Sequence, residues 1–234
     1  MENQNTQPNP PVDFTKQFSF KLENLLKFLF CAFSFISIIP SKITILGQVA
    51  GLMACYMGLT RQIGGIRFNK EYLGSFIRNE FGNTIFYIAL LFMVDGPKVV
   101  FSFPVVLFFV IGLSELALRS DISILKSNWV QEKARVVVAY KNDIKVARCI
   151  VELLLFFYSI VLVIIGKIGF MFPIMAFNYL RIRGMANPLC NQTFTLVQNK
   201  ILGKLNGINL PGKGVLIKIV SFLFGMFTKV PGNN

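Results

Sequence analysis

The chain has no histidine and only 11 acidic residues among its 234. Histidine is the commonest side-chain general base and metal ligand, and it is the base of most nucleophilic triads. The sequence also lacks a G-x-S-x-G motif, a Walker A loop and a Rossmann glycine pattern. We therefore predict that the protein is not an enzyme, with no catalytic residue, no cofactor, no metal site and no small-molecule substrate.

Cysteine is sparse as well. The four cysteines, Cys31, Cys55, Cys149 and Cys190, are far apart, and no C-x-x-C pair occurs. Three of them lie in or at the edge of apolar runs. Zinc sites and disulfide frameworks have patterned spacings, so we expect embedded small hydrophobic side chains instead of either.

Charge is the third scarcity, because charged residues make up 15% of the chain whereas soluble domains average about 25%. Hydrophobic residues make up 54%, including 25 Phe. This balance is typical of a membrane protein. The first 24 residues are polar and lack the apolar core of a cleavable signal, so any span is expected to be an internal, uncleaved anchor.

The longest apolar run covers residues 99–118 and contains one charge, Glu115. Twenty helical residues reach about 30 Å, the thickness of a hydrocarbon core, and no other segment passes that test unaided. A tight turn at 95–98 connects it to a shorter run, and the same pattern occurs on either side. The three pairs of runs are 25–39 with 43–59, 84–94 with 99–118, and 149–165 with 170–180.

We therefore predict an all-α membrane protein of three helical hairpins, about six membrane-embedded helices. Gly47 and Gly51 form a G-x-x-x-G spacing that lets helices approach closely. Runs 84–94 and 170–180 are too short, at about 16 Å of helix, for a reticulum bilayer of about 27 Å. Either they extend into flanking polar residues as ordinary tilted spans, or the hairpins insert shallowly and widen the cytosolic leaflet.

Two polar connectors separate the hairpins. The helical spacing of apolar residues within 61–83 predicts a short helix on the membrane surface or against its neighbours. Residues 119–148 predict an amphipathic helix that runs into the next apolar run. One face of the second connector is a candidate partner-binding face, formed by Trp129, Val136, Tyr140 and Ile144, with Ala147 on the same side.

Basic residues are sorted along the chain. Of 24 Lys and Arg, 21 lie in the terminal regions and the two long connectors, whereas each hairpin turn holds one: Lys42, Lys98 and Lys167. Positive residues beside membrane helices stay in the cytosol, so both termini and both connectors are predicted to be cytosolic. Because the basic residues flank apolar runs, the net charge of +13 indicates anionic lipid and not nucleic acid as the partner.

The last apolar segment, 215–229, has one narrow polar stripe if it is helical. We predict a membrane-surface helix; the alternative is docking on the protein's own bundle. Burial of its apolar side chains and the entropy of ordering them nearly cancel, so the helix needs a bilayer or a partner. The residues expected to contact the membrane surface are Lys218, Phe222, Phe224, Phe227 and Lys229.

Two acids lie inside apolar runs. Glu115 precedes Arg119 by four residues, and Glu152 follows Arg148 by four. This spacing favours local ion pairs. The alternative is a transporter or channel that uses Glu115 and Glu152 as proton or ion sites.

Short patterns through the chain, together with the order of elements, resemble one family. The motif residues are Phe103 and Pro104 in the longest run, Tyr179 and Arg181, and then Asn187, Pro188 and Cys190. The sequence is similar to the transmembrane protein 33 family, which includes the pore-membrane nucleoporin Pom-thirty-three. The resemblance covers nearly the whole chain from about residue 20.

The resemblance implies a non-enzymatic protein of the endoplasmic reticulum membrane and nuclear envelope that shapes curved membrane, with roles in tubular reticulum and nuclear pore assembly or distribution. Implied partners are the lipid bilayer, reticulon-type membrane proteins, nucleoporins or a second copy. A membrane adaptor remains an alternative. We expect a disordered cytosolic tail at 1–20, a membrane domain at 21–190 and a cytosolic amphipathic region at 191–234.

Overall fold

The computed structural model describes residues 14–36, 42–67, 69–94, 98–119, 125–208 and 211–228. Every regular element in these ranges is a helix, which confirms the predicted all-α class. The helices are α1 (Phe14–Ile36), α2 (Lys42–Ile63), α3 (Lys70–Arg78), α4 (Glu80–Leu91), α5 (Lys98–Arg119), α6 (Asn128–Ala139), α7 (Lys141–Ile164), α8 (Met171–Ala186), α9 (Pro188–Gly207) and α10 (Lys213–Phe227).

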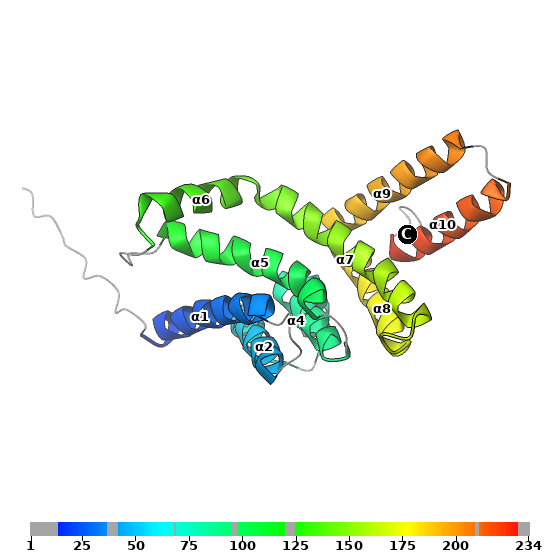
Figure 1. Cartoon of the computed structure of the whole chain (residues 1–234). Helices are drawn as coiled ribbons and strands as arrows, with labels where there is room; N and C mark the ends of the chain where they lie inside the picture. The colour runs from blue at the N-terminus through cyan, green and yellow to red at the C-terminus, as the bar shows by residue number, and fades with distance from the viewer. Residues whose placement is uncertain are drawn as a thin grey trace, which may run out of the picture.

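Helices that follow one another in the chain pack as pairs (Figure 1). The pairs α1–α2, α4–α5 and α7–α8 correspond to the three predicted hairpins, and α9–α10 forms a fourth that projects from the bundle. The turns predicted at 40–42 and 95–98 fall partly outside the described residues. The third turn, after α7, contains Gly166 at φ 72°, a left-handed conformation that favours glycine.

Two of the described helices, α5 and α7, are long and apolar enough to span a membrane. The expectation that only 99–118 passes this test is therefore wrong, because α7 begins at Lys141 and adds eight residues to the apolar run. None of the other described helices meets this test. Helix α8 continues past its apolar run to Ala186, and α4 begins at Glu80, so both short runs do extend into flanking polar residues.

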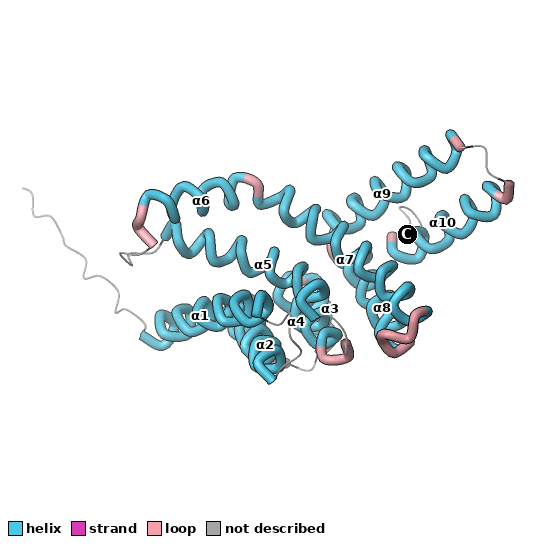
Figure 2. Tube along the Cα trace, in the orientation of Figure 1, coloured by secondary structure: helices cyan, strands magenta, loops and turns pink. Residues whose placement is uncertain are grey.

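The described turn residues of the second and third hairpins lie on one side of the molecule (Figure 2). Residues 92–94, after α4, and the loop between α7 and α8 both lie at the lower edge of the view, whereas α6 lies at the upper edge (Figure 2). The loop between α7 and α8 therefore lies on the opposite side of the molecule from α6, the helix of the basic second connector (Figure 2). The arrangement agrees with the sorting of basic residues along the sequence.

The α1–α2 interface contains the predicted G-x-x-x-G pair, and close packing there is confirmed. A Cβ on Gly47 would lie 2.8 Å from Phe33 Cβ, and one on Gly51 would lie 2.4 Å from Phe30 Cδ2. Phe30 in turn meets Phe109 of α5 edge to face, with 5.2 Å between ring centroids. Glycine thus lets α1 and α2 approach, and α5 packs on α1.

The helix starts follow from local chemistry. Asn79 caps α4 by accepting a hydrogen bond from the Phe81 N–H at 2.8 Å, and Asn69 caps α3 in the same way. Helix α1 begins at Phe14, so the predicted disordered tail to residue 20 is too long at its end. Residues 1–13 lie outside the described residues.

Many large apolar side chains remain exposed on the bundle. Soluble proteins rarely carry contiguous apolar patches of more than a few hundred Å², so this surface fits contact with lipid acyl chains. Examples on four helices are Leu25, Phe28, Leu46, Met53, Leu154, Val161, Ile164, Met171 and Ile174.

Candidate functional site

The C-terminal half of α10 docks on the protein's own bundle. Phe224 and Phe227 are 2% and 0% exposed. The Phe227 ring lies 5.1 Å from that of Phe177 on α8 and 5.7 Å from that of Phe156 on α7. The prediction that Phe224 and Phe227 face the membrane surface is therefore corrected, because the aromatic pocket of the bundle buries both rings.

The N-terminal half of α10 is exposed, in contrast to the docked C-terminal half. Its apolar side chains Val215, Leu216, Ile219 and Phe222 are exposed, Phe222 by 67%. Their spacing puts them on one helical face, and Lys218 lies at the edge of that face. Lys229 lies outside the described residues. The amphipathic surface predicted for the terminal helix is thus carried by residues 215–222.

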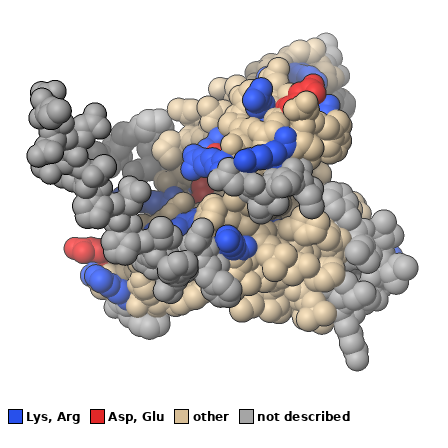
Figure 3. Space-filling view, turned by 90° about the vertical axis from the view of Figure 1, so that its left-hand side faces the viewer, with Lys and Arg blue, Asp and Glu red and all other residues tan. Residues whose placement is uncertain are grey.

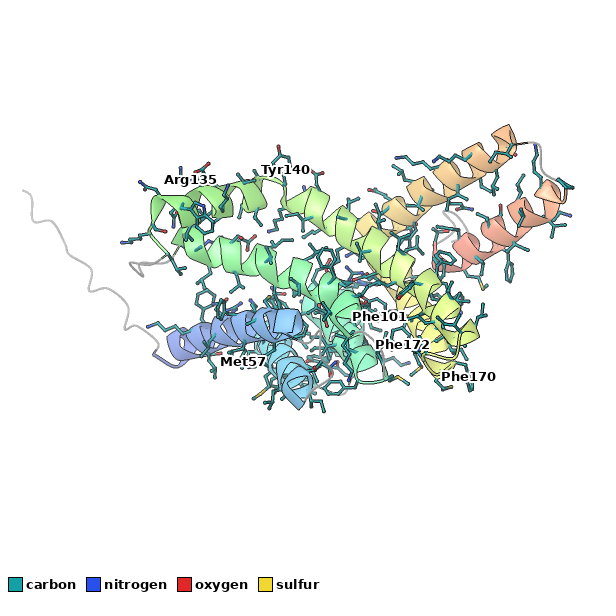
Figure 4. The ribbon with its side chains drawn as sticks, viewed as in Figure 1. Met57, Phe101, Arg135, Tyr140, Phe170 and Phe172 are labelled. Atoms are coloured by element: carbon teal, nitrogen blue, oxygen red, sulfur yellow. A yellow bond between two sulfur atoms is a disulfide. The ribbon has the colours of Figure 1, made fainter. Side chains whose placement is uncertain are left out.

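The predicted partner face belongs to α6 and the start of α7. Trp129, Val136 and Tyr140 are exposed, and Ile144 is half-buried. Helix α6 packs on α5 through the buried Ala134, so the aromatic residues point outward, and the Tyr140 and Arg135 side chains project from the upper edge of the molecule (Figure 4). The predicted continuous helix is interrupted at Tyr140, where α6 ends and α7 begins.

A buried ion-pair network joins α7 to α8. Glu152 of α7 accepts hydrogen bonds at Oε1 from Arg148 Nε (2.9 Å) and from the Tyr179 hydroxyl (3.1 Å). Arg183 Nε of α8 lies 2.6 Å from Glu152 Oε2, as an ion pair without hydrogen-bond geometry. The predicted Arg148–Glu152 pair is confirmed. Arg183, which is only 1% exposed, was missed because its partner Glu152 lies on another helix.

Glu80, in the first turn of α4, completes the network. Arg148 and Arg183 both donate to its Oε2, at 3.4 and 3.3 Å, and Asn187 Nδ2 donates to its Oε1 at 2.7 Å. Burial alone raises the pKa of Glu80, but the charges of Arg183, Arg148 and Lys145 outweigh it and hold the pKa below its ordinary value. Two carboxylates and two guanidinium groups thus neutralise one another where four helices meet.

Glu115, the second acid that lies inside an apolar run, has a different partner from the one predicted. Glu115 pairs with Lys141 at the start of α7, not with Arg119. The tertiary approach of α7 to α5 brings Lys141 to the carboxylate, and sequence spacing cannot reveal that approach. In the described part of the chain, no group of three His, Cys, Asp or Glu is arranged to hold a metal.

The motif residues divide between structure and surface. Asn187 caps α9 by accepting from the N–H groups of Leu189 (3.0 Å) and Cys190 (3.3 Å), and Pro188 occupies the first turn. Tyr179 belongs to the ion-pair network and Pro104 is buried within α5. Phe103 and Arg181 are exposed.

Cys190 corrects the cysteine expectation. It forms a disulfide with Cys149, which joins α9 to α7 next to Arg148 and Asn187. The two residues are 41 apart in sequence, so spacing gave no sign of the pairing. Cys31 and Cys55 are free.

These features define an all-helical membrane protein with a buried ionic junction and an amphipathic terminal helix. The chain matches the family model described as transmembrane protein 33/nucleoporin POM33 over residues 13–228. It therefore belongs to this family, and the resemblance drawn from the motif residues is confirmed. No curated protein and no solved structure matches the chain.

Proposed function

We propose that this protein shapes or stabilises curved membrane of the endoplasmic reticulum and nuclear envelope, with both termini in the cytosol, and that it does so without enzymatic activity. The observation that carries the proposal is the division of α10. One half is anchored by Phe224 and Phe227, and the other presents four large apolar side chains beside Lys218. A helix fixed to a bundle in this way inserts into one leaflet as a rigid wedge.

Membership of the family supports a membrane and nuclear pore setting. Reticulon-type proteins, nucleoporins or a second copy are proposed partners on the resemblance alone. The exposed apolar side chains of α1, α2, α7 and α8 support embedding of those helices in lipid. Because Glu152 pairs with Arg148 and Arg183, and Glu115 with Lys141, both carboxylates have structural partners, and we do not propose transport.

The test uses full-length protein reconstituted into liposomes whose shape is followed by electron microscopy. Replacing Ile219 and Phe222 by Asp puts two charges into the exposed apolar face without touching the buried anchor. We expect the variant to remain inserted but to lose tubulation. The matched control, Thr195→Asp with Gln198→Asp, adds the same charge to polar α9 and leaves tubulation intact. Undiminished tubulation by the α10 variant would refute the wedge.

A membrane adaptor is the second candidate, because the α6 face is apolar, exposed and unpartnered within the described residues. Trp129 is 69% exposed and Tyr140 59%. Replacing both by Ala should lose co-purifying proteins while membrane insertion and tubulation persist. If the same proteins are recovered with this variant, the α6 face is not the docking surface.

A further inference from the structure

Basic side chains from five helices line a cavity of about 440 Å³ on the side of the molecule where α1 begins and α5 ends. Figure 3 shows Lys and Arg gathered across the middle of this face. The lining cations are Lys27 of α1, Arg61 of α2, Arg78 of α3, Arg119 of α5, and Lys141 and Lys145 of α7. Only two carboxylates, Glu80 and Glu115, are among the lining residues.

The acids around the cavity are already engaged. Glu23, buried behind it, lies 2.5 Å from Lys27 Nζ and 2.9 Å from an Arg61 guanidinium nitrogen. Glu115 pairs with Lys141, and Glu80 pairs with Arg148 and Arg183. Among the described residues this leaves three cations, Arg78, Arg119 and Lys145, without an ion pair to a carboxylate. The cavity therefore carries an uncompensated positive charge.

Gly112 of α5 keeps the cavity open. A Cβ at this position would meet only the Lys27 side chain, whose Nζ would be 3.4 Å away, and nothing else within 4 Å. A glycine inside a helix is destabilising relative to alanine, and no close helix contact requires one here. A larger side chain at 112 would occupy the space between the cations.

The cations also occupy equivalent places along their helices. Arg61 and Arg119 follow the apolar runs of α2 and α5, whereas Arg78 and Lys145 precede those of α4 and α7. Antiparallel helices bring these ends to one level of the bundle, where a membrane would meet water. The same cavity has an apolar part of its wall, formed by Phe81, Phe108, Ile111 and Leu116.

We propose that this cavity binds the phosphate group of an anionic lipid headgroup, with Arg78, Arg119 and Lys145 as its principal ligands. A phosphomonoester carries about −1.5 to −2 charges at neutral pH and accepts charge-assisted hydrogen bonds from guanidinium and ammonium groups. The volume lies within the range of ordinary ligand pockets. The apolar wall would lie along the start of the acyl chains. This proposal does not depend on the curvature role or on α10.

The experiment measures binding of dioctanoyl phosphatidic acid to the full-length protein in neutral detergent by calorimetry. Dioctanoyl phosphatidylcholine, inorganic phosphate and inositol phosphate are the comparison ligands. Replacing Arg78, Arg119 and Lys145 by Gln should weaken phosphatidic acid binding at least about tenfold, because the phosphate then loses its charge-assisted hydrogen bonds. Replacing Lys133, Arg135 and Lys204, which are exposed and lie outside the cavity, removes the same charge and should leave binding unchanged.

A second variant tests the space inside the cavity independently of the charges that line it. Gly112→Leu fills the space and keeps every cation, so it should abolish binding while the thermal unfolding midpoint stays at or above that of the parent protein. Equal losses in both triple variants would show diffuse charge attraction and overturn the site. Unchanged binding in Gly112→Leu would also overturn it. Inorganic or inositol phosphate binding as tightly as phosphatidic acid would overturn the lipid as the source of the phosphate.

Discussion

Arg183 of α8 places its Nε 2.6 Å from Oε2 of Glu152 on α7, and both side chains are almost fully buried. The contact links the two helices of the third hairpin, α7 and α8. Through Glu80 and Arg148 it reaches α4, and through Asn187 it reaches the start of α9. The junction thus fixes the position of the α9–α10 pair relative to the hydrophobic bundle.

Removing the central carboxylate should destabilise the protein strongly. Glu152→Gln leaves Arg148 and Arg183 buried with less than full compensation, and loss of one partner of a buried ion pair costs about 3–5 kcal/mol. We expect a lower midpoint of thermal unfolding in detergent. The exposed Glu132→Gln on α6 is the control and should be neutral, and equal midpoints for the two variants would contradict the role of the network.

Glu80 should make stability depend on pH. Its pKa is depressed in the folded protein, so its contribution is fully present above the unfolded pKa of about 4.3 and is lost as pH falls through the folded value. Parent protein and Glu80→Gln should therefore differ most in unfolding free energy near neutral pH and converge in acid. Chemical unfolding at a series of pH values measures this difference in unfolding free energy. A difference that grows toward acidic pH would contradict the prediction.

Gly184 should be needed for docking of the terminal helix. A Cβ on Gly184 would lie 2.0 Å from the Phe227 carbonyl oxygen, so Gly184→Ala forces α10 away from α8. Gly203→Ala meets nothing within 4 Å and should stabilise α9 by up to about 1 kcal/mol. Limited proteolysis should cleave near α10 faster only in the first variant. Identical cleavage rates would mean that α10 docks elsewhere.

The hairpin turns should report how deeply the pairs insert. Cysteines placed at Lys98 and Lys167 should behave alike toward membrane-impermeant reagents, because both positions lie at the turn end of a hairpin. Lumenal labelling of both would establish full spans, whereas labelling from neither side would support shallow hairpins. A cysteine at Lys133 on α6 should label from the cytosol. Lumenal labelling there would refute the proposed orientation of the chain.

Local pattern was a sound guide to the helices and to one interface. Alternation of apolar runs with basic connectors predicted the paired helices, and Gly47 and Gly51 indicated the α1–α2 contact that the structure contains. The Arg148–Glu152 pair was also visible, because both residues lie on one helix four positions apart. Each of these features depends on residues close together in sequence.

Contacts between residues far apart in the sequence could not be predicted. Glu115 has Arg119 four residues away, but α7 supplies Lys141 instead. Cys149 and Cys190 gave no spacing signal. The six cations of the basic cavity are spread from residue 27 to residue 145 and resemble ordinary flanking charges until five helices bring them together.

The amino-acid sequence alone determined that this protein is helical, membrane-associated and a member of its family, because hydrophobic run length, charge placement and short motifs are local properties. Tertiary structure decided which faces of those helices are used. It buried Phe224 and Phe227, left Phe222 exposed, and gathered Glu80, Arg148, Glu152 and Arg183 into one neutral junction. The physical reason is that burial and ion pairing depend on distances in space, which only the packing of distant segments defines.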